Sequence, residues 1–344
     1  MPDPKPRPAA PDPAPADTAP GAAAETGPRP RGGFRRLAPL VRLLGTVGLM
    51  ALALRGVEWP QLWAVLRGAD WRWWGAGLAL MLAVQAVAAV RWAMLARPVG
   101  FDLPLVLFVR RFFEGLFFNL FLPTSIGGDV VKAYRLADTT GGRVLAACTV
   151  LADRLAGLTA LGVIGTTALV AHQRSLAATS SLAVGVAIAG GVMLVARTVV
   201  ANLERLVAIL PRNRAVDLLA ARLLPYQRRP SLITSAIGWG LVVQIGGVLS
   251  TACVARSLGV AIPLPTWFMV VPLVSLMTVL PISIGGMGVR EGMMTVMLAP
   301  LGVRKETAVA IGLLAFLTSV ACGFVGGLVF LAEGRAPDPS RDRR

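Results

Sequence analysis

The sequence has few of the side chains that soluble enzymes and metalloproteins use. Its 344 residues include one histidine, His172, and three cysteines, Cys148, Cys253 and Cys322, with no CxxC spacing. A histidine-based metal site or a Ser/His/Asp triad within this chain is therefore excluded by count. The cysteines lie inside apolar runs, so we expect packed thiols. The sequence predicts no metal site and no cofactor.

Charge is also scarce, and acidic charge most of all. Charged residues make up 15% of the chain against 55% hydrophobic residues, and the mean hydropathy is +0.68. This balance largely excludes a soluble enzyme and favours a polytopic membrane protein. The 34 Lys and Arg residues outnumber 18 Asp and Glu residues, but most lie in the tails and between apolar runs. We interpret them as topology signals facing an anionic membrane surface, and we expect no nucleic-acid partner.

The two ends of the chain are polar. Residues 1–36 contain ten prolines among alanines and scattered charges, a composition that predicts a disordered tail and not a secretory signal. Residues 333–344 form a second tail, and residues 37–332 are the predicted transmembrane domain.

Six apolar runs are candidates for membrane spans, which need about 20 helical residues. They cover residues 37–54, 71–95, 144–170, 181–196, 232–254 and 307–331. Two further runs, 103–122 and 267–280, each end in a proline and glycine cluster and resume as short helix-compatible segments, 130–136 and 289–298. Each broken run predicts a re-entrant helical hairpin, because irregular backbone at membrane depth survives only inside protein or beside a water-filled cavity.

The two clusters are copies of one motif. Residues 122–133 read LPTSIGGDVVKA and residues 280–291 read LPISIGGMGVRE, an offset of 158 residues with seven identities. Chance would give roughly one identity, so we infer a duplication. The hairpin motif comprises Pro123, Ser125, Gly127 and Gly128 in the first copy and Pro281, Ser283, Gly285, Gly286 and Gly288 in the second.

The arginine distribution predicts how the copies are oriented. Basic residues favour the cytoplasmic side of a membrane. Three basic parts of the chain should therefore face the cytoplasm: Arg35 and Arg36, the Arg-rich segment 197–230, and the C-terminal tail. Repeat one (37–171) and repeat two (181–332) would then be inverted, with both termini cytoplasmic in the inner membrane. We expect segment 197–230 to contain an interfacial helix. The predicted fold is all-α: about six spans plus two re-entrant hairpins in two inverted repeats.

Ionisable side chains at membrane depth are the candidates for a transport pathway, because they are costly there unless paired or hydrated. Asp153 and Arg154 are about 100° apart on one helix, so each should pair with another element. Asp129 and Lys132 are the expected partners, and a static buried ion-pair network is the alternative to a pathway. Lys132 and Arg290 could instead bind phosphate at helix N-termini, or Ser125 or Asp129 could simply cap a helix.

Other polar and aromatic residues have simpler interpretations. Arg91, Arg110 and Arg111 are expected to extend toward lipid headgroups. The tryptophans between 59 and 74 are expected to form an interfacial belt.

Three motifs follow one another in the chain: Asn119 with LPTSIGGDVVKAYRL, then LADRLAGL, and then LPISIGGMGVREG. Together they resemble the flippase-like transmembrane domain of the lysylphosphatidylglycerol synthase family. The resemblance covers roughly residues 37–332 and implies a polytopic bundle that moves a lipid across the bilayer. Lys132 stands where the family commonly has arginine. The polar core that the resemblance implies is Asn119, Asp129, Lys132, Asp153, Arg154, Arg290 and Glu291.

The synthases carry a soluble aminoacyl-transferring domain, which these 344 residues do not include. We therefore expect a non-enzymatic lipid translocator whose partners are membrane lipids. The alternatives are a membrane scaffold that recruits a lipid- or glycan-modifying enzyme, and an intramembrane enzyme using Asp153 or Glu291 as acid or base.

Overall fold

The computed structural model describes residues 33–122, 127–138, 142–172, 221–223, 226, 228–280 and 282–333. Several predicted features lie outside the described residues. They are Pro123, Ser125, Pro281, run 181–196 and most of segment 197–230. Contacts divide the chain into two units, residues 1–37 and 38–344. Of the first unit the structure describes only the start of helix α1 (Gly33–Leu54), which begins inside the predicted tail.

The described residues form helices and no strands, which confirms the all-α class. In the described part of the chain, four helices are long and apolar enough to cross a membrane: α3 (Trp71–Ala96), α6 (Arg143–His172), α10 (Pro230–Ser257) and α13 (Lys305–Glu333). They coincide with four of the six predicted runs. In α1 the apolar helix Arg42–Leu54 is shorter than a full span, and run 181–196 is not described, so the total of six spans stays a prediction.

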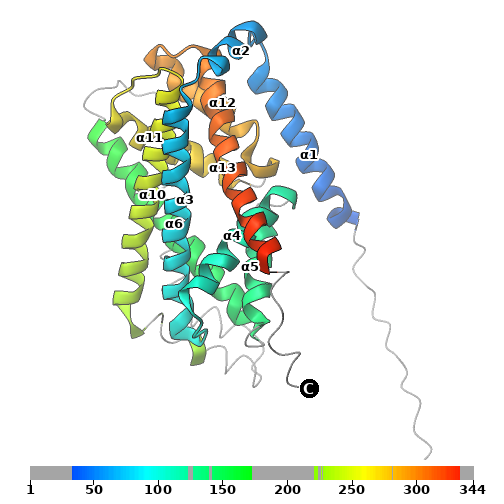
Figure 1. Cartoon of the computed structure of the whole chain (residues 1–344), viewed down its shortest axis with the longest axis vertical. Helices are drawn as coiled ribbons and strands as arrows, with labels where there is room; N and C mark the ends of the chain where they lie inside the picture. Colours follow the sequence, from blue (N-terminus) through cyan, green and yellow to red (C-terminus); the bar gives the residue numbers. More distant parts are fainter. Residues whose placement is uncertain are drawn as a thin grey trace, which may run out of the picture. The chain divides into compact units, whose positions relative to one another are not determined.

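The two broken runs form helix pairs. The first pair is α4 (Leu105–Phe121) and α5 (Gly127–Ala137), and the second is α11 (Leu264–Val279) and α12 (Val289–Leu298), joined through the short 3-10 helix η2 (Ile284–Gly286). Figure 1 shows α4 and α5 toward the end of the bundle where α10 begins, and α12 toward the end where α10 terminates. The predicted breaks therefore occur, and the two pairs lie at opposite ends.

Helix positions recur at the motif offset. Adding 158 to the bounds of α4 gives 263–279, against Leu264–Val279 for α11. The helix contacts recur between the two copies. Helix α4 packs on α13, and its counterpart α11 packs on α6. Helix α5 packs on α6, and its counterpart α12 packs on α13. The counterparts α3 and α10 pack against each other.

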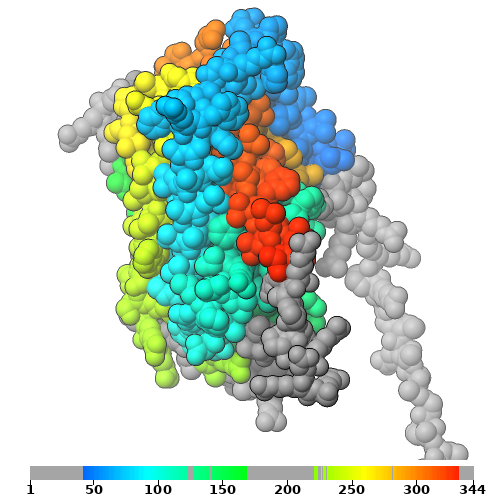
Figure 2. All heavy atoms as spheres, viewed as in Figure 1, coloured from blue at the N-terminus to red at the C-terminus, as the bar shows by residue number. Residues whose placement is uncertain are grey.

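Short helices complete the ends of the bundle. They are α2 (Trp59–Arg67) before α3, η1 (Arg97–Val99) after it, and η3 (Ala299–Leu301) before α13. Trp59, Trp63 and Trp71 are more than half exposed at this α2 end, and Figure 2 shows α2 and the start of α3 at the surface there. An interfacial belt of tryptophans fits this placement.

The first helix pair packs on a core centred on Trp92 of α3. The Trp92 ring meets Phe108 edge to face at 5.2 Å, and its Nε1–H donates to the Thr149 hydroxyl at 3.1 Å. Because the indole N–H is satisfied, this large side chain is buried without an unpaired donor. The core thereby joins α3, α4 and α6 beneath the first hairpin.

Candidate functional site

A chain of ion pairs ties the first hairpin to the bundle. Asp129 of α5 lies 2.8 Å from the Lys132 ammonium through Oδ1. The Arg154 guanidinium of α6 donates to both carboxylate oxygens of Asp129, at 2.7 and 3.1 Å. Lys132 also lies over the Phe112 ring, 4.5 Å from its centroid. The predicted pairing of Asp129 with Arg154 is therefore present, and it links α5 to α6.

The partner of Asp153 differs from the prediction. Arg91 Nε of α3 donates to Asp153 Oδ1 at 2.8 Å, whereas Asp129 or Lys132 had been expected. Arg91 is also not directed toward headgroups as predicted, since it is only 5% exposed. Gly157 and Gly240 explain why, because a Cβ at either position would lie within 3.5 Å of the Arg91 guanidinium. Glycines on two other helices thus leave room for a buried arginine.

These five side chains form what we name the charge cluster: Arg91, Asp129, Lys132, Asp153 and Arg154. Three cations face two carboxylates, so the cluster carries one net positive charge when all are ionised. The Arg154 side chain is 48% exposed, whereas those of Asp129 and Lys132 are 8% and 6% exposed. The cluster can therefore hold three helices together and still offer one guanidinium to an anion outside.

A second ionic group was missed as a site by sequence reasoning. Glu114 of α4 is fully buried, and its Oε2 lies 3.2 Å from Arg135 Nε of α5 and 3.5 Å from Arg111 Nη1. Arg111 therefore does not extend to headgroups as predicted, whereas Arg110 is exposed. The spacing of Arg135 three residues after Lys132 was the available signal, since it places both cations on one helix face.

A hydrogen bond between α4 and α5 holds the two arms of the first hairpin together. The Gly128 backbone N–H donates to Asn119 Oδ1 at 2.7 Å, so Asn119 supplies an acceptor at the start of α5. A Cβ at Gly128 would overlap the Gly115 carbonyl oxygen, which shows how closely α4 and α5 approach. Lys132 pairs with Asp129 as well, and the phosphate site considered for this hairpin stays a prediction.

The second hairpin turn depends on backbone conformation. Gly285, Gly286 and Gly288 have φ values of +62°, +74° and +80°, a region that side chains disfavour. The Gly288 N–H donates to Glu291 Oε2 at 2.6 Å, so Glu291 caps α12. The Ile284 N–H donates to the Thr46 hydroxyl of α1 at 2.7 Å. Helix α1 is thus attached directly to this turn.

The second hairpin has no carboxylate at the position equivalent to Asp129. The residue equivalent to Asp129 is Met287, and the residue equivalent to Lys132 is Arg290. Among the described residues, buried Arg290 Nη1 has no hydrogen-bond partner, and the same holds for Ser283 Oγ and Glu291 Oε1. The Arg290 guanidinium lies 5.9 Å from the centre of the Phe316 ring. Unsatisfied buried donors and acceptors suit a polar ligand group, because leaving them unpaired is unfavourable.

Comparison with known proteins agrees with this architecture. No curated protein matches the chain. The model of the lysylphosphatidylglycerol synthase TM region matches residues 40–327, which include both hairpins, the charge cluster, the long helices α3, α6 and α10, and most of α13. The match confirms the resemblance drawn from the motifs and indicates an integral membrane protein of lipid-related processes. The chain belongs to the lysylphosphatidylglycerol synthase transmembrane family.

Proposed function

We propose that this protein moves a lipid between the leaflets of the cytoplasmic membrane. The observation that carries the proposal is the pair of glycine hairpins, which interrupt the bundle from opposite ends and differ in how their cations are neutralised. A path for a headgroup needs polar groups inside the membrane, and ionisable residues at that depth mark such paths. The exchange of packing partners between the helix pairs supports two inverted repeats, an arrangement common in transporters.

The electrostatics suggest how a headgroup would be recognised. Arg154, bound to Asp129 yet half exposed, is the cation of the charge cluster that a phosphate could reach first. Arg290 would serve the same purpose at the second hairpin, since its Nη1 lacks an acceptor. The translocation involves no covalent step. Asp153 pairs with Arg91, and Glu291 Oε2 caps α12, so both carboxylates make structural contacts within the bundle.

A scaffold that recruits a lipid- or glycan-modifying enzyme is the second candidate. Arg228 and Arg229 are exposed just before α10, and they would face the cytoplasm if basic residues mark that side. A scaffold needs this surface but does not need the hairpin cations. The two functions can therefore be separated by substitution.

The test is lipid movement in vesicles that contain the purified full chain. Fluorescent phospholipids placed in one leaflet, with a membrane-impermeant quencher outside, report transfer. We expect Arg154→Gln and Arg290→Gln to slow transfer strongly while Arg110→Gln, on the exposed face of α4, does not. Transfer no faster than in protein-free vesicles, for every phospholipid headgroup class tried, would contradict translocation and favour the scaffold.

A further inference from the structure

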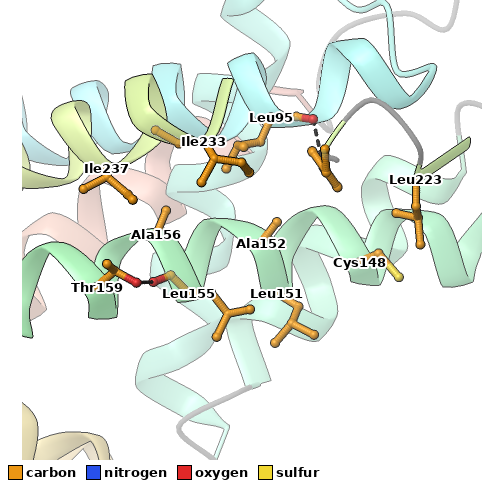
Figure 3. A pocket seen from close by; sticks show the side chains of 12 residues that line it. Leu95, Cys148, Leu151, Ala152, Leu155, Ala156, Thr159, Leu223, Ile233 and Ile237 are labelled. Atoms are coloured by element: carbon orange, nitrogen blue, oxygen red, sulfur yellow. Dashed lines mark hydrogen bonds between the residues drawn. The ribbon is translucent and has the colours of Figure 1, made fainter. Parts of the chain in front are cut away.

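An apolar groove runs between α6 and α10, away from both hairpin turns. Its walls come from α6, α10, α3 and the residues just before α10, as Figure 3 shows. The lining residues are Leu95, Cys148, Leu151, Ala152, Leu155, Ala156, Thr159, Leu223, Tyr226, Ile233, Ala236 and Ile237. Leu151 is 54% exposed, so the groove reaches the outer surface of the bundle.

The two polar side chains in the lining present no unpaired polar group to the groove. The Thr159 hydroxyl donates to the Leu155 carbonyl at 2.8 Å, and the Tyr226 hydroxyl donates to the Leu95 carbonyl at 2.9 Å, both drawn as dashed lines in Figure 3. The groove therefore offers aliphatic and aromatic carbon, and a hydrocarbon chain fits that chemistry.

The length of the groove matches one leaflet. Cys148 and Thr159 mark its ends on α6, and at 1.5 Å rise per residue they are about 17 Å apart along the helix axis. A single leaflet contributes about half of a hydrocarbon core that is about 30 Å thick. A groove of this length, parallel to the helices, can hold most of one extended acyl chain.

Exposed positive charge collects at one end of the groove, whereas at the other end the Arg91 guanidinium is buried and paired with Asp153. Arg229 precedes the lining residue Ile233 by four positions, and Arg222 precedes the lining residue Leu223. Arg222, Arg228 and Arg229 are all exposed. At the opposite end, α6 and α10 close at Gly240, where a Cβ would lie 2.9 Å from Ala160 Cβ. The groove is thus apolar along its length, cationic at its mouth and closed near the bundle centre.

We infer that this groove holds one acyl chain of an anionic phospholipid from the leaflet on the arginine-bearing side, with its phosphate at Arg228 and Arg229. Charge complementarity identifies the headgroup, and the length and lining identify the chain. The site is separate from the hairpin pathway, because neither the hairpin turns nor the charge cluster line it. A bound lipid here would fill the space between α6 and α10.

Photocrosslinking tests the site with the full chain in vesicles of phosphatidylcholine. The probe is phosphatidylglycerol with a photoreactive diazirine near the end of one acyl chain, and crosslinked peptides are identified by mass spectrometry. We expect crosslinks on α6 residues 148–159 and α10 residues 233–237, several-fold stronger than with the same diazirine on phosphatidylcholine. Equal crosslinking by both lipids, or equal crosslinking on exposed Phe324 and Leu328 of α13, would show bulk lipid only and overturn the inference.

Two sets of variants sharpen the test. Ala152→Trp should fill the groove and reduce the crosslinks several-fold, whereas Leu328→Trp, on the exposed face of α13, should not. The double substitution of Arg228 and Arg229 by Gln should remove the preference for phosphatidylglycerol and leave the groove intact. Unchanged crosslinking in both sets would refute the site.

A third measurement does not depend on a tryptophan variant that folds. Cys148 lines the groove, so phosphatidylglycerol should slow its alkylation by N-ethylmaleimide in a chain whose Cys253 and Cys322 are replaced by alanine. The same alkylation rate with and without phosphatidylglycerol would contradict occupancy. None of these readouts measures lipid transfer, so their failure is distinguishable from failure of the translocation proposal.

Discussion

At the scale of single residues, the buried charges are tolerable only as pairs. Asp153 is 4% exposed and Arg91 5% exposed, and taking either charge out of water costs several kcal/mol unless a close partner offsets it. Their 2.8 Å contact supplies that partner. The pair is therefore better understood as a condition for α3 and α6 to pack than as a large net gain in stability.

Asp153→Asn should destabilise the protein by about 3–5 kcal/mol, because it leaves Arg91 charged and without its carboxylate. Thermal unfolding in detergent measures the loss. Asp102→Asn, in the exposed connection before α4, is the matched control and should unfold like the original chain. A melting temperature for the Asp153 variant equal to that of the control would mean that Arg91 is not held by Asp153.

Gly128→Ala should be destabilising by about 1–3 kcal/mol or more, because the new methyl group would overlap the Gly115 carbonyl of the facing helix. Gly247→Ala is the control, since a Cβ there meets nothing within 4 Å. Thermal unfolding of the two variants decides the point. If they unfold alike, the close approach of α4 and α5 is not what requires glycine in the first turn.

At the scale of elements, the two hairpins achieve similar turns by different means. The first is held by close helix packing and the ion pairs of Asp129, whereas the second depends on three glycines with positive φ and on the capping carboxylate of Glu291. At Gly285 a Cβ would meet nothing nearer than 3.9 Å, so backbone strain and not lack of space disfavours alanine there. In the described part of the chain, the second turn is bonded to α1 through Ile284 and Thr46.

Thr46→Val should loosen the contact between α1 and the second hairpin. The substitution keeps the shape of the side chain but removes the acceptor of the Ile284 N–H, and an unsatisfied buried donor costs about 1–3 kcal/mol. Hydrogen exchange at residues 282–288 should become faster. Thr46→Ser keeps the hydroxyl and should restore slow exchange, while equally slow exchange in the valine variant would show that this bond does not hold α1.

At the scale of the whole molecule, the arrangement of helices makes a prediction about sidedness. Ala261, between α10 and α11, and Asp102, before α4, are both exposed. They lie at opposite ends of α10 and α3, which pack side by side. If both helices span the bilayer, these two positions face opposite compartments.

In a chain without its native cysteines, Ala261→Cys should react from outside the cell with a membrane-impermeant thiol reagent. Asp102→Cys should react only after the membrane is permeabilised, because the arginine distribution puts its end of the bundle inside. Labelling of intact cells followed by a gel shift measures both. Reaction of Asp102→Cys in intact cells would overturn the predicted orientation.

The sequence by itself determined the class of protein, the four long helices and the two breaks, because each depends on neighbours in the chain. The length of an apolar run decides whether a helix can span, and a local proline and glycine cluster decides where it stops. The repeat was visible for the same reason, since its identities occupy one contiguous motif. Asp129 and Arg154 could be named in advance as ionisable residues at membrane depth, and Asn119 through the family resemblance.

Only the tertiary structure decided which charges meet. Arg91 binds Asp153, and Glu114 binds Arg135, and the first of these contacts depends on Gly157 and Gly240 of other helices. The groove between α6 and α10 likewise exists only where two packed helices diverge. The physical reason is that the side chains of neighbouring helices set the rotation and depth of each helix. These neighbours can be far apart in sequence, as Thr46 and Ile284 are at 238 residues, whereas a local pattern describes one helix at a time.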